Sequence, residues 1–173
     1  MKHILFISVN DHVPWGGSEE LWSKTARHIN ASHNVSVLVK RWHPEPKPIE
    51  KLKAQGVKVY YKYVQKKQSL KNRLLHKVFK VPYQKTHHLD QDDIEKTDLV
   101  VITLGNHLDF QLYYYTDYLQ EHNIPYVLVL QLVTDLRGIL DSDINKFRES
   151  YLKAIKLYFL SKDNIDKAEM LFS

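Results

Sequence analysis

Residues 2–22 read KHILFISVNDHVPWGGSEELW, and this stretch decides the fold class of the chain. The apolar run from Ile4 to Val9 has the length and composition of a buried strand, and it is too short for the apolar core of a secretory signal. A short loop follows it, and a helix begins after the pair Gly16-Gly17. A strand that leads through a glycine-containing loop into a helix is the opening half of a βαβ unit.

The same alternation of short apolar runs and longer amphipathic stretches continues along the rest of the chain. It predicts crossover helices and a parallel sheet rather than hairpins. The predicted strands are Ile4–Val9, Val35–Lys40, Val57–Tyr63, Leu99–Leu104, Tyr126–Leu130 and Leu157–Leu160. Several are apolar on both faces, as expected for central strands covered by helices on each side. We therefore predict an α/β, Rossmann-like three-layer sandwich with a mainly parallel sheet of about six strands.

The composition and the absence of several motifs narrow the possible functions. Because the chain has no cysteine, disulfides, thiolate zinc sites and cysteine nucleophiles are excluded, and a cytoplasmic location is expected. The nicotinamide fingerprint G-x-G-x-x-G, the P-loop and the G-x-S-x-G elbow of serine hydrolases are all missing. The pair His87-His88 lacks the spacing of zinc sites, so no metal is assigned.

Basic residues concentrate between Glu50 and Asp90, where no acidic residue intervenes. They are Lys51, Lys53, Lys58, Lys62, Lys66, Lys67, Lys71, Arg73, Lys77, Lys80 and Lys85. Lys71, Arg73, Lys77 and Lys80 interleave with apolar residues at helical spacing, which predicts a cationic amphipathic helix. Such a helix contacts an anionic membrane peripherally, at its inner face, or packs its apolar stripe on the sheet. Because no nucleic-acid reading module is recognisable, no nucleic-acid partner is expected.

The candidate site lies beyond the carboxyl ends of the predicted strands, where open parallel sheets bind ligands. Glycines let a ligand approach the backbone, and a helix N-terminus suits phosphate. The candidate binding residues are Gly16, Gly17, Ser18, Asn106, His107, Gln131 and Asp135. The alternative is structural, in which the glycine pair turns the chain, Ser18 caps the helix, and Glu19 and Glu20 stabilise the helix dipole. Leu21, Ala26 and Ile29 are the apolar residues of this predicted helix.

Two segments resemble the N-terminal domain of GT-B glycosyltransferases of the large family-4 type. The first is residues 2–22, with a strand, a short loop, Gly16-Gly17-Ser18-Glu19 and a helix. The second is residues 157–164, which resemble the segment where the last strand of that domain reaches a serine and crosses into the second domain. The resemblance implies an acceptor-side domain over residues 1–161. Residues 162–173 would begin the crossover helix toward a C-terminal, donor-binding domain.

The resemblance also implies an activity. It implies transfer of a sugar from a nucleotide-sugar donor to a hydroxyl of a glycan or lipid-linked acceptor, with retention and without a metal or another cofactor, in polysaccharide or glycoconjugate synthesis. One departure is Gln131, which stands where family members often place a histidine after the fifth strand. A larger departure is the lack of the donor-binding domain, so the 173 residues alone are not expected to catalyse transfer efficiently.

Three other functions stay open at this point. The chain could be a non-catalytic module that binds a glycan or an anionic membrane. It could also be one subunit of a split enzyme. A flavodoxin-like signalling domain is the third alternative, although the first strand is not followed by an acidic phosphoacceptor cluster.

Overall fold

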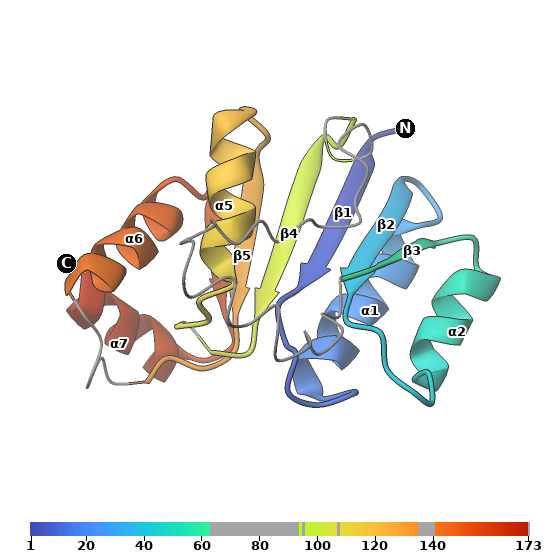
Figure 1. The fold of residues 1–173 in the computed structure, drawn as a ribbon, viewed down its shortest axis with the longest axis horizontal. Coiled ribbons are helices and arrows are strands. Elements are labelled where there is room, and N and C mark those ends of the chain that lie inside the picture. The colour runs from blue at the N-terminus through green and yellow to red at the C-terminus, as the bar shows by residue number, and fades with distance from the viewer. Residues whose placement is uncertain (63–93, 95, 107, 135–140, 173) are drawn as a thin grey trace, which may run out of the picture.

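Six parallel strands form one sheet in the computed structural model, which describes residues 1–62, 94, 96–106, 108–134 and 141–172 (Figure 1). The strands are β1 (His3–Ser8), β2 (Asn34–Val39), β3 (Lys58–Tyr61), β4 (Leu99–Leu104), β5 (Tyr126–Leu130) and β6 (Lys156–Phe159). Their order across the sheet is β3-β2-β1-β4-β5-β6, and each neighbouring pair is parallel. The predicted fold class and all six strands are thereby confirmed.

The strand order also separates two kinds of α/β protein. A flavodoxin-like sheet has the order 2-1-3-4-5, so its third strand lies beside its first. Here the neighbours of β1 are β2 and β4, with Phe6 in register with Val37 and Val101. This is the 3-2-1-4-5-6 order of the Rossmann arrangement. The flavodoxin-like alternative is therefore wrong.

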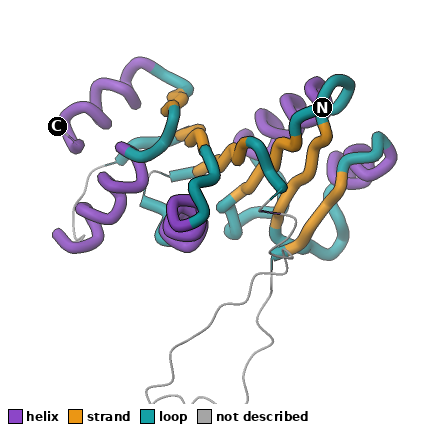
Figure 2. Tube along the Cα trace, turned by 90° about the horizontal axis from the view of Figure 1, so that it is seen from above, coloured by secondary structure: helices purple, strands orange, loops and turns teal. Residues whose placement is uncertain are grey.

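Five helices of the described chain cover the sheet. They are α1 (Gly17–Ile29), α2 (Lys47–Ala54), α5 (Leu112–Glu121), α6 (Asp141–Leu152) and α7 (Lys162–Phe172). Seen from above, α1 and α2 lie on one face of the sheet and α5 and α6 on the other (Figure 2). The last helix, α7, packs beside β6 at the edge of the sheet.

The central strand β1 shows why both faces must be covered. Phe6 points into a cluster that contains Trp22 of α1, whereas Leu5 and Ile7 point into the opposite cluster with Leu119 of α5. All five side chains are at most 2% exposed. Because each such side chain stabilises the folded state by about 1.5–3 kcal/mol when buried, an apolar strand of this kind is stable only between two helical layers.

The start of α1 differs from the prediction. Gly16, not Ser18, occupies the N-cap position, and no side chain caps the helix. The hydroxyl of Ser18 instead donates to the carboxylate of Glu19, 2.7 Å away. Leu21 is 38% exposed, while Trp22 takes the buried position. The larger indole removes more apolar surface from water, which explains why the helix turns this face toward the sheet.

Two buried tyrosines, Tyr115 on α5 and Tyr151 on α6, are expected to make the fold sensitive to alkaline pH. Burial raises the pKa of both hydroxyls well above the value near 10 of an unfolded chain. Their contribution to stability is therefore complete below pH 10 and is lost as the pH rises further. We expect the free energy of unfolding in urea to fall above about pH 10 by up to about 1.4 kcal/mol per pH unit for each group.

The matched variants for this prediction are Tyr151→Phe and Tyr114→Phe, because the Tyr114 side chain is 46% exposed. The first should flatten the pH dependence measured between pH 9 and pH 11, and the second should leave it unchanged. An equal slope in the wild-type protein and in Tyr151→Phe would contradict the prediction.

Candidate ligand-binding site at the carboxyl edge of the sheet

The strand order reverses beside β1, and this reversal defines the candidate site. From β1 the chain proceeds outward to β2 and β3, and it then returns to the other side of β1 as β4. The loop after β1 leads to α1 on one face, while the loop after β4 leads to α5 on the opposite face (Figures 1 and 2). Loops that diverge in this way leave a crevice at the carboxyl edge, which is where open α/β sheets bind ligands.

The glycines after β1 and β4 leave the backbone of this edge accessible. No atom lies within 4 Å of the position that a Cβ would take at Gly17 or Gly105. At Gly16 a Cβ would lie 3.3 Å from Oε2 of Glu19. Because no side chain caps α1, its first N–H groups are available to an anionic group of a ligand.

A buried carboxylate fixes the start of α1 to the end of β1. The side chain of Glu19 is buried, with the residue 5% exposed. Its Oε1 accepts a hydrogen bond from Ser8 Oγ at 3.1 Å, and its Oε2 accepts one from Ser18 Oγ at 2.7 Å. Ser18, a predicted ligand contact, therefore lies inside this buried network, with its hydroxyl already engaged.

A second polar network joins the loops after β1, β3 and β4. Lys62 Nζ lies 2.9 Å from Asp11 Oδ1 and donates to Gln111 Oε1 at 3.2 Å. Gln111 Nε2 donates to the other carboxylate oxygen of Asp11 at 2.8 Å, which closes the triangle. The Lys62 side chain is 6% exposed and that of Asp11 is 27% exposed. Burial lowers the pKa of the Lys62 ammonium, and the neighbouring Asp11 opposes this shift.

Two further groups complete this network. Lys40, after β2, donates to the backbone carbonyl of Asp11 at 2.6 Å. Asp109 accepts from the backbone N–H of Gln111 at 2.9 Å, and burial raises the pKa of its carboxyl group. The network thus joins four separate loops, including the loops after β1 and β4 on the two sides of the crevice.

The loops after β4 and β5, which carry the predicted binding residues Asn106 and Gln131, lie side by side in the structure. Asn106 Nδ2 donates to Thr134 Oγ1 at 3.5 Å. The backbone N–H of Gln131 donates to Leu104 O at 3.1 Å, and its side-chain nitrogen is buried without a hydrogen-bond partner among the described residues. His107 and Asp135 lie outside the described residues.

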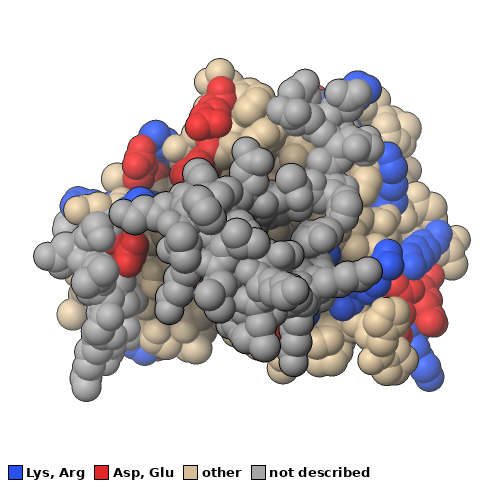
Figure 3. Space-filling view, in the orientation of Figure 1, with Lys and Arg blue, Asp and Glu red and all other residues tan. Residues whose placement is uncertain are grey.

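The predicted anion-contact residues Lys71, Arg73, Lys77 and Lys80 also lie outside the described residues. Elsewhere, lysine and arginine side chains are visible along the side formed by β2, β3 and α2 (Figure 3). Lys53 on this side is paired with Glu45 at 2.8 Å. In the described ranges no helix is long and apolar enough to span a membrane, and no group of three or more potential metal ligands occurs.

Asn164, in the first turn of α7, anchors the loop after β5. Its Nδ2 donates to the carbonyl oxygen of Gln131 at 2.7 Å, and its Oδ1 accepts from the backbone N–H of Val133 at 3.1 Å. Asn164 is itself 5% exposed. One side chain therefore satisfies two backbone groups of a loop that borders the candidate site.

Replacing Asn164 by alanine is expected to lower the free energy of unfolding by about 2 kcal/mol, because the variant leaves buried backbone groups of this loop unsatisfied. The neighbouring Asp163→Ala variant is the control, since it removes an exposed ion pair with Lys167 and a first-turn carboxylate, and it should change stability by less than about 1 kcal/mol. Urea denaturation of both variants measures the difference. Equal midpoints would show that the anchor does not stabilise the loop.

No family model matches this chain, and the comparison with curated proteins also finds no match. Solved structures do match. The crystal structures of HepE from Anabaena in complex with UDP, and in complex with UDP and glucose, each align with a TM-score of 0.59 at 15% identity. The alignment covers 99% of this chain and 41% of HepE. At this identity the likeness extends to the fold, and the chain spans less than half the length of that protein.

A further match is the TrkA-N domain of the inner membrane protein YbaL from Escherichia coli. It aligns with a TM-score of 0.43 at 10% identity and covers 99% of this chain and 97% of that one. This likeness is too low to support a conclusion about the chain.

Proposed function

We propose that this chain is the N-terminal, acceptor-side half of a glycosyltransferase that moves a sugar from a nucleotide-sugar donor to an acceptor hydroxyl. In this proposal residues 1–161 form the first domain, and α7 begins the crossing into a second domain that holds most of the nucleotide. Retention of configuration, a glycan or lipid-linked acceptor and a metal-independent reaction are parts of the same proposal.

The observation that carries the proposal is the fold likeness to HepE, combined with the position of the glycine loop. HepE was crystallised in complex with UDP and in complex with UDP and glucose. The alignment covers 99% of this chain and 41% of HepE. In this chain the uncapped start of α1 lies at the carboxyl edge, where the strand order reverses. That position suits the diphosphate and the transferring end of a nucleotide sugar.

The residues of this chain would contribute mainly by positioning and by electrostatics. The N–H groups at Gly16 and Gly17 would face the phosphate side of the donor, and Asn106 and Gln131 would bind hydroxyl groups from the opposite wall of the crevice. Amide side chains both donate and accept hydrogen bonds, which suits a polyol. Holding donor and acceptor in one orientation is a large part of the catalysis of group transfer.

The test is to measure nucleotide release by the full-length natural protein from UDP-, GDP- and dTDP-sugars, with and without glycan acceptors. The proposal predicts that one donor class releases its nucleotide and that an acceptor accelerates the release. Glycan binding without nucleotide release from any donor would overturn the proposal and favour a non-catalytic binding module.

A further inference from the structure

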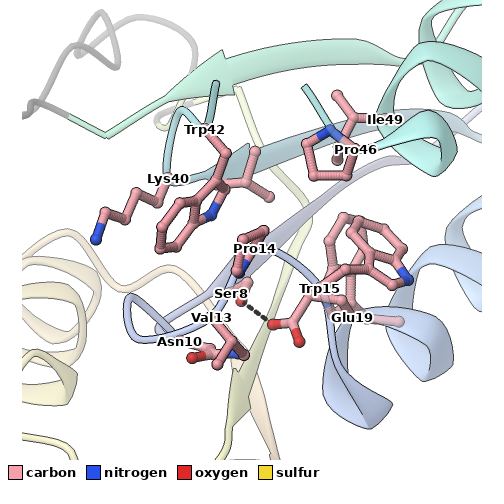
Figure 4. Close-up of a pocket in the computed structure, with 12 residues that line it drawn as sticks. Ser8, Asn10, Val13, Pro14, Trp15, Glu19, Lys40, Trp42, Pro46 and Ile49 are labelled. Carbon is pink, nitrogen blue, oxygen red and sulfur yellow. Dashed lines mark hydrogen bonds between the residues drawn. The ribbon is translucent and has the colours of Figure 1, made fainter. Parts of the chain in front are cut away.

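All three tryptophans of the chain line one hollow on the β2 side of the loop after β1. The sequence contains Trp15, Trp22 and Trp42 and no other tryptophan. All three border the hollow, together with Pro14 and Pro46 (Figure 4). Trp15 and Trp42 are half-buried and flank the hollow, whereas Trp22 is 2% exposed. One indole from the loop before α1, a second from α1 and a third from the loop after β2 therefore converge at one hollow.

The size of the hollow limits how a ligand can use it. Its enclosed space is about 10 Å³, which is room for one water-sized group. A ligand would therefore insert a single small polar group and lay the rest of its surface on the flanking side chains. Since the half-buried indoles of Trp15 and Trp42 and the two prolines flank it, that surface must be flat and partly apolar.

The polar groups around the hollow indicate that the inserted group is a hydrogen-bond donor. The buried carboxylate of Glu19 borders it, and each carboxylate oxygen accepts one hydrogen bond from a protein hydroxyl and has a second lone pair. Asn10 also borders the hollow. Lys40 contributes an ammonium group, which lies 4.2 Å from the ring centre of Trp42. An acceptor-only carboxylate calls for a hydrogen-bond donor.

Trp22 contributes a buried hydrogen-bond donor that has no acceptor in the described part of the chain. Its indole N–H is buried and has no acceptor among the described residues. Buried donors are nearly always satisfied in folded proteins, by protein groups, by water or by ligands. Because Trp22 lines the hollow, its unpaired indole N–H is a group that a bound molecule can satisfy.

We propose that this hollow is the subsite for one pyranose ring of the acceptor glycan, which rests on the proposed transferase function. A pyranose has an apolar C–H face that stacks on an indole, together with hydroxyl groups that donate to Glu19 and accept from Asn10 and Lys40. One hydroxyl or hydroxymethyl group enters the enclosed space, and the ring lies against Trp42. The flat apolar face and the single inserted donor match a neutral sugar.

The test uses the indole N–H signals of the three tryptophans in an NMR titration of the full-length protein. The probes are methyl glucoside, methyl galactoside, methyl mannoside and, separately, uridine. We expect at least one methyl glycoside to shift the signals of Trp15 and Trp42, with no response to uridine. A response to uridine alone would overturn the proposal in favour of a nucleobase site, and no response to any probe would overturn it outright.

The glycoside affinities of three variants distinguish the loss of a stacking surface from a general loss of structure. Trp42→Ala should weaken glycoside binding about tenfold, because it removes the stacking surface. Trp42→Phe should restore most of the affinity, because a phenyl ring keeps that surface. The control is Tyr158→Ala, which removes a 48% exposed aromatic ring from β6 and should leave the affinity unchanged. Equal affinity in Trp42→Ala and the wild-type protein would overturn the proposal.

The experiments distinguish an error in the subsite assignment from an error in the proposed function. If the transferase function is correct and the subsite is wrong, the protein releases nucleotide from a donor, but Trp42→Ala leaves the KM for the acceptor unchanged. If the subsite is correct and the transferase function is wrong, the indole signals respond to a glycoside while no donor is consumed. A correct subsite in a transferase raises the acceptor KM about tenfold in Trp42→Ala and leaves the donor KM unchanged.

Discussion

If the proposed function is correct, replacing Gly17 by arginine in the full-length protein is expected to reduce kcat/KM for the nucleotide sugar by at least about 100-fold while the protein stays folded. Gly17 is exposed, and no atom lies within 4 Å of the place where its Cβ would stand. The arginine side chain therefore has room outside the core and would occupy the crevice that the ligand needs. A positive charge at the start of α1 opposes the helix dipole, at a cost of only about 0.3–1 kcal/mol.

Two alanine variants serve as controls and separate the effect of the long arginine side chain from the effect of losing a glycine. Gly17→Ala adds one methyl group into open space and should keep activity within a few fold. Gly16→Ala instead brings a Cβ to 3.3 Å from Oε2 of Glu19 and should lower stability more than Gly17→Ala does. Activity and thermal unfolding are measured for all three variants. A folded Gly17→Arg protein with wild-type kcat/KM would contradict the placement of the site.

The second large effect is expected on stability, from Asp11→Ala. This variant leaves the ammonium group of Lys62 buried without its carboxylate partner, and breaking a buried ion pair in this way typically costs about 3–5 kcal/mol. Because Asp11 is partly exposed, we expect the lower end of that range. The loss should appear as a lower midpoint in urea denaturation at neutral pH.

The reverse variant, Lys62→Met, should be milder. It leaves a carboxylate that water can partly reach, and methionine fills the space of the lysine stem. The double variant Asp11→Ala/Lys62→Met should be more stable than Asp11→Ala alone, because no unpaired buried charge remains. Finding the double variant less stable than Asp11→Ala would show that the ion pair does not determine the stability of this edge.

The fold could be predicted from the sequence because the strands carry their own signal. The bounds of β4 and β5 match the predicted bounds, since both strands are continuous apolar runs between polar segments. The helix α2 was not predicted, because the prolines of residues 44–48 resemble a rigid loop. Pro48 in fact occupies the first turn of α2, where a proline is tolerated because the N–H it lacks would have no partner.

The candidate site could be predicted less completely, because its contacts depend on the order of the strands. Asp11 pairs with Lys62 across 51 positions and with Gln111 across 100 positions. No local pattern marks such a pair. Glu19 was missed for another reason, because a glutamate in the first turn of a helix is ordinarily exposed and stabilises the helix dipole.

Hydrogen–deuterium exchange of the full-length protein, with and without UDP and glucose, is the measurement that shows whether ligands bind at the carboxyl edge of this sheet. The two ligands are those present in the HepE structure. We expect exchange to slow in peptides covering residues 10–20 and 104–112, which form the two sides of the crevice, and to be unchanged in residues 152–160 at the far edge of the sheet. Unchanged exchange in both crevice segments while the ligands are bound elsewhere would contradict the account.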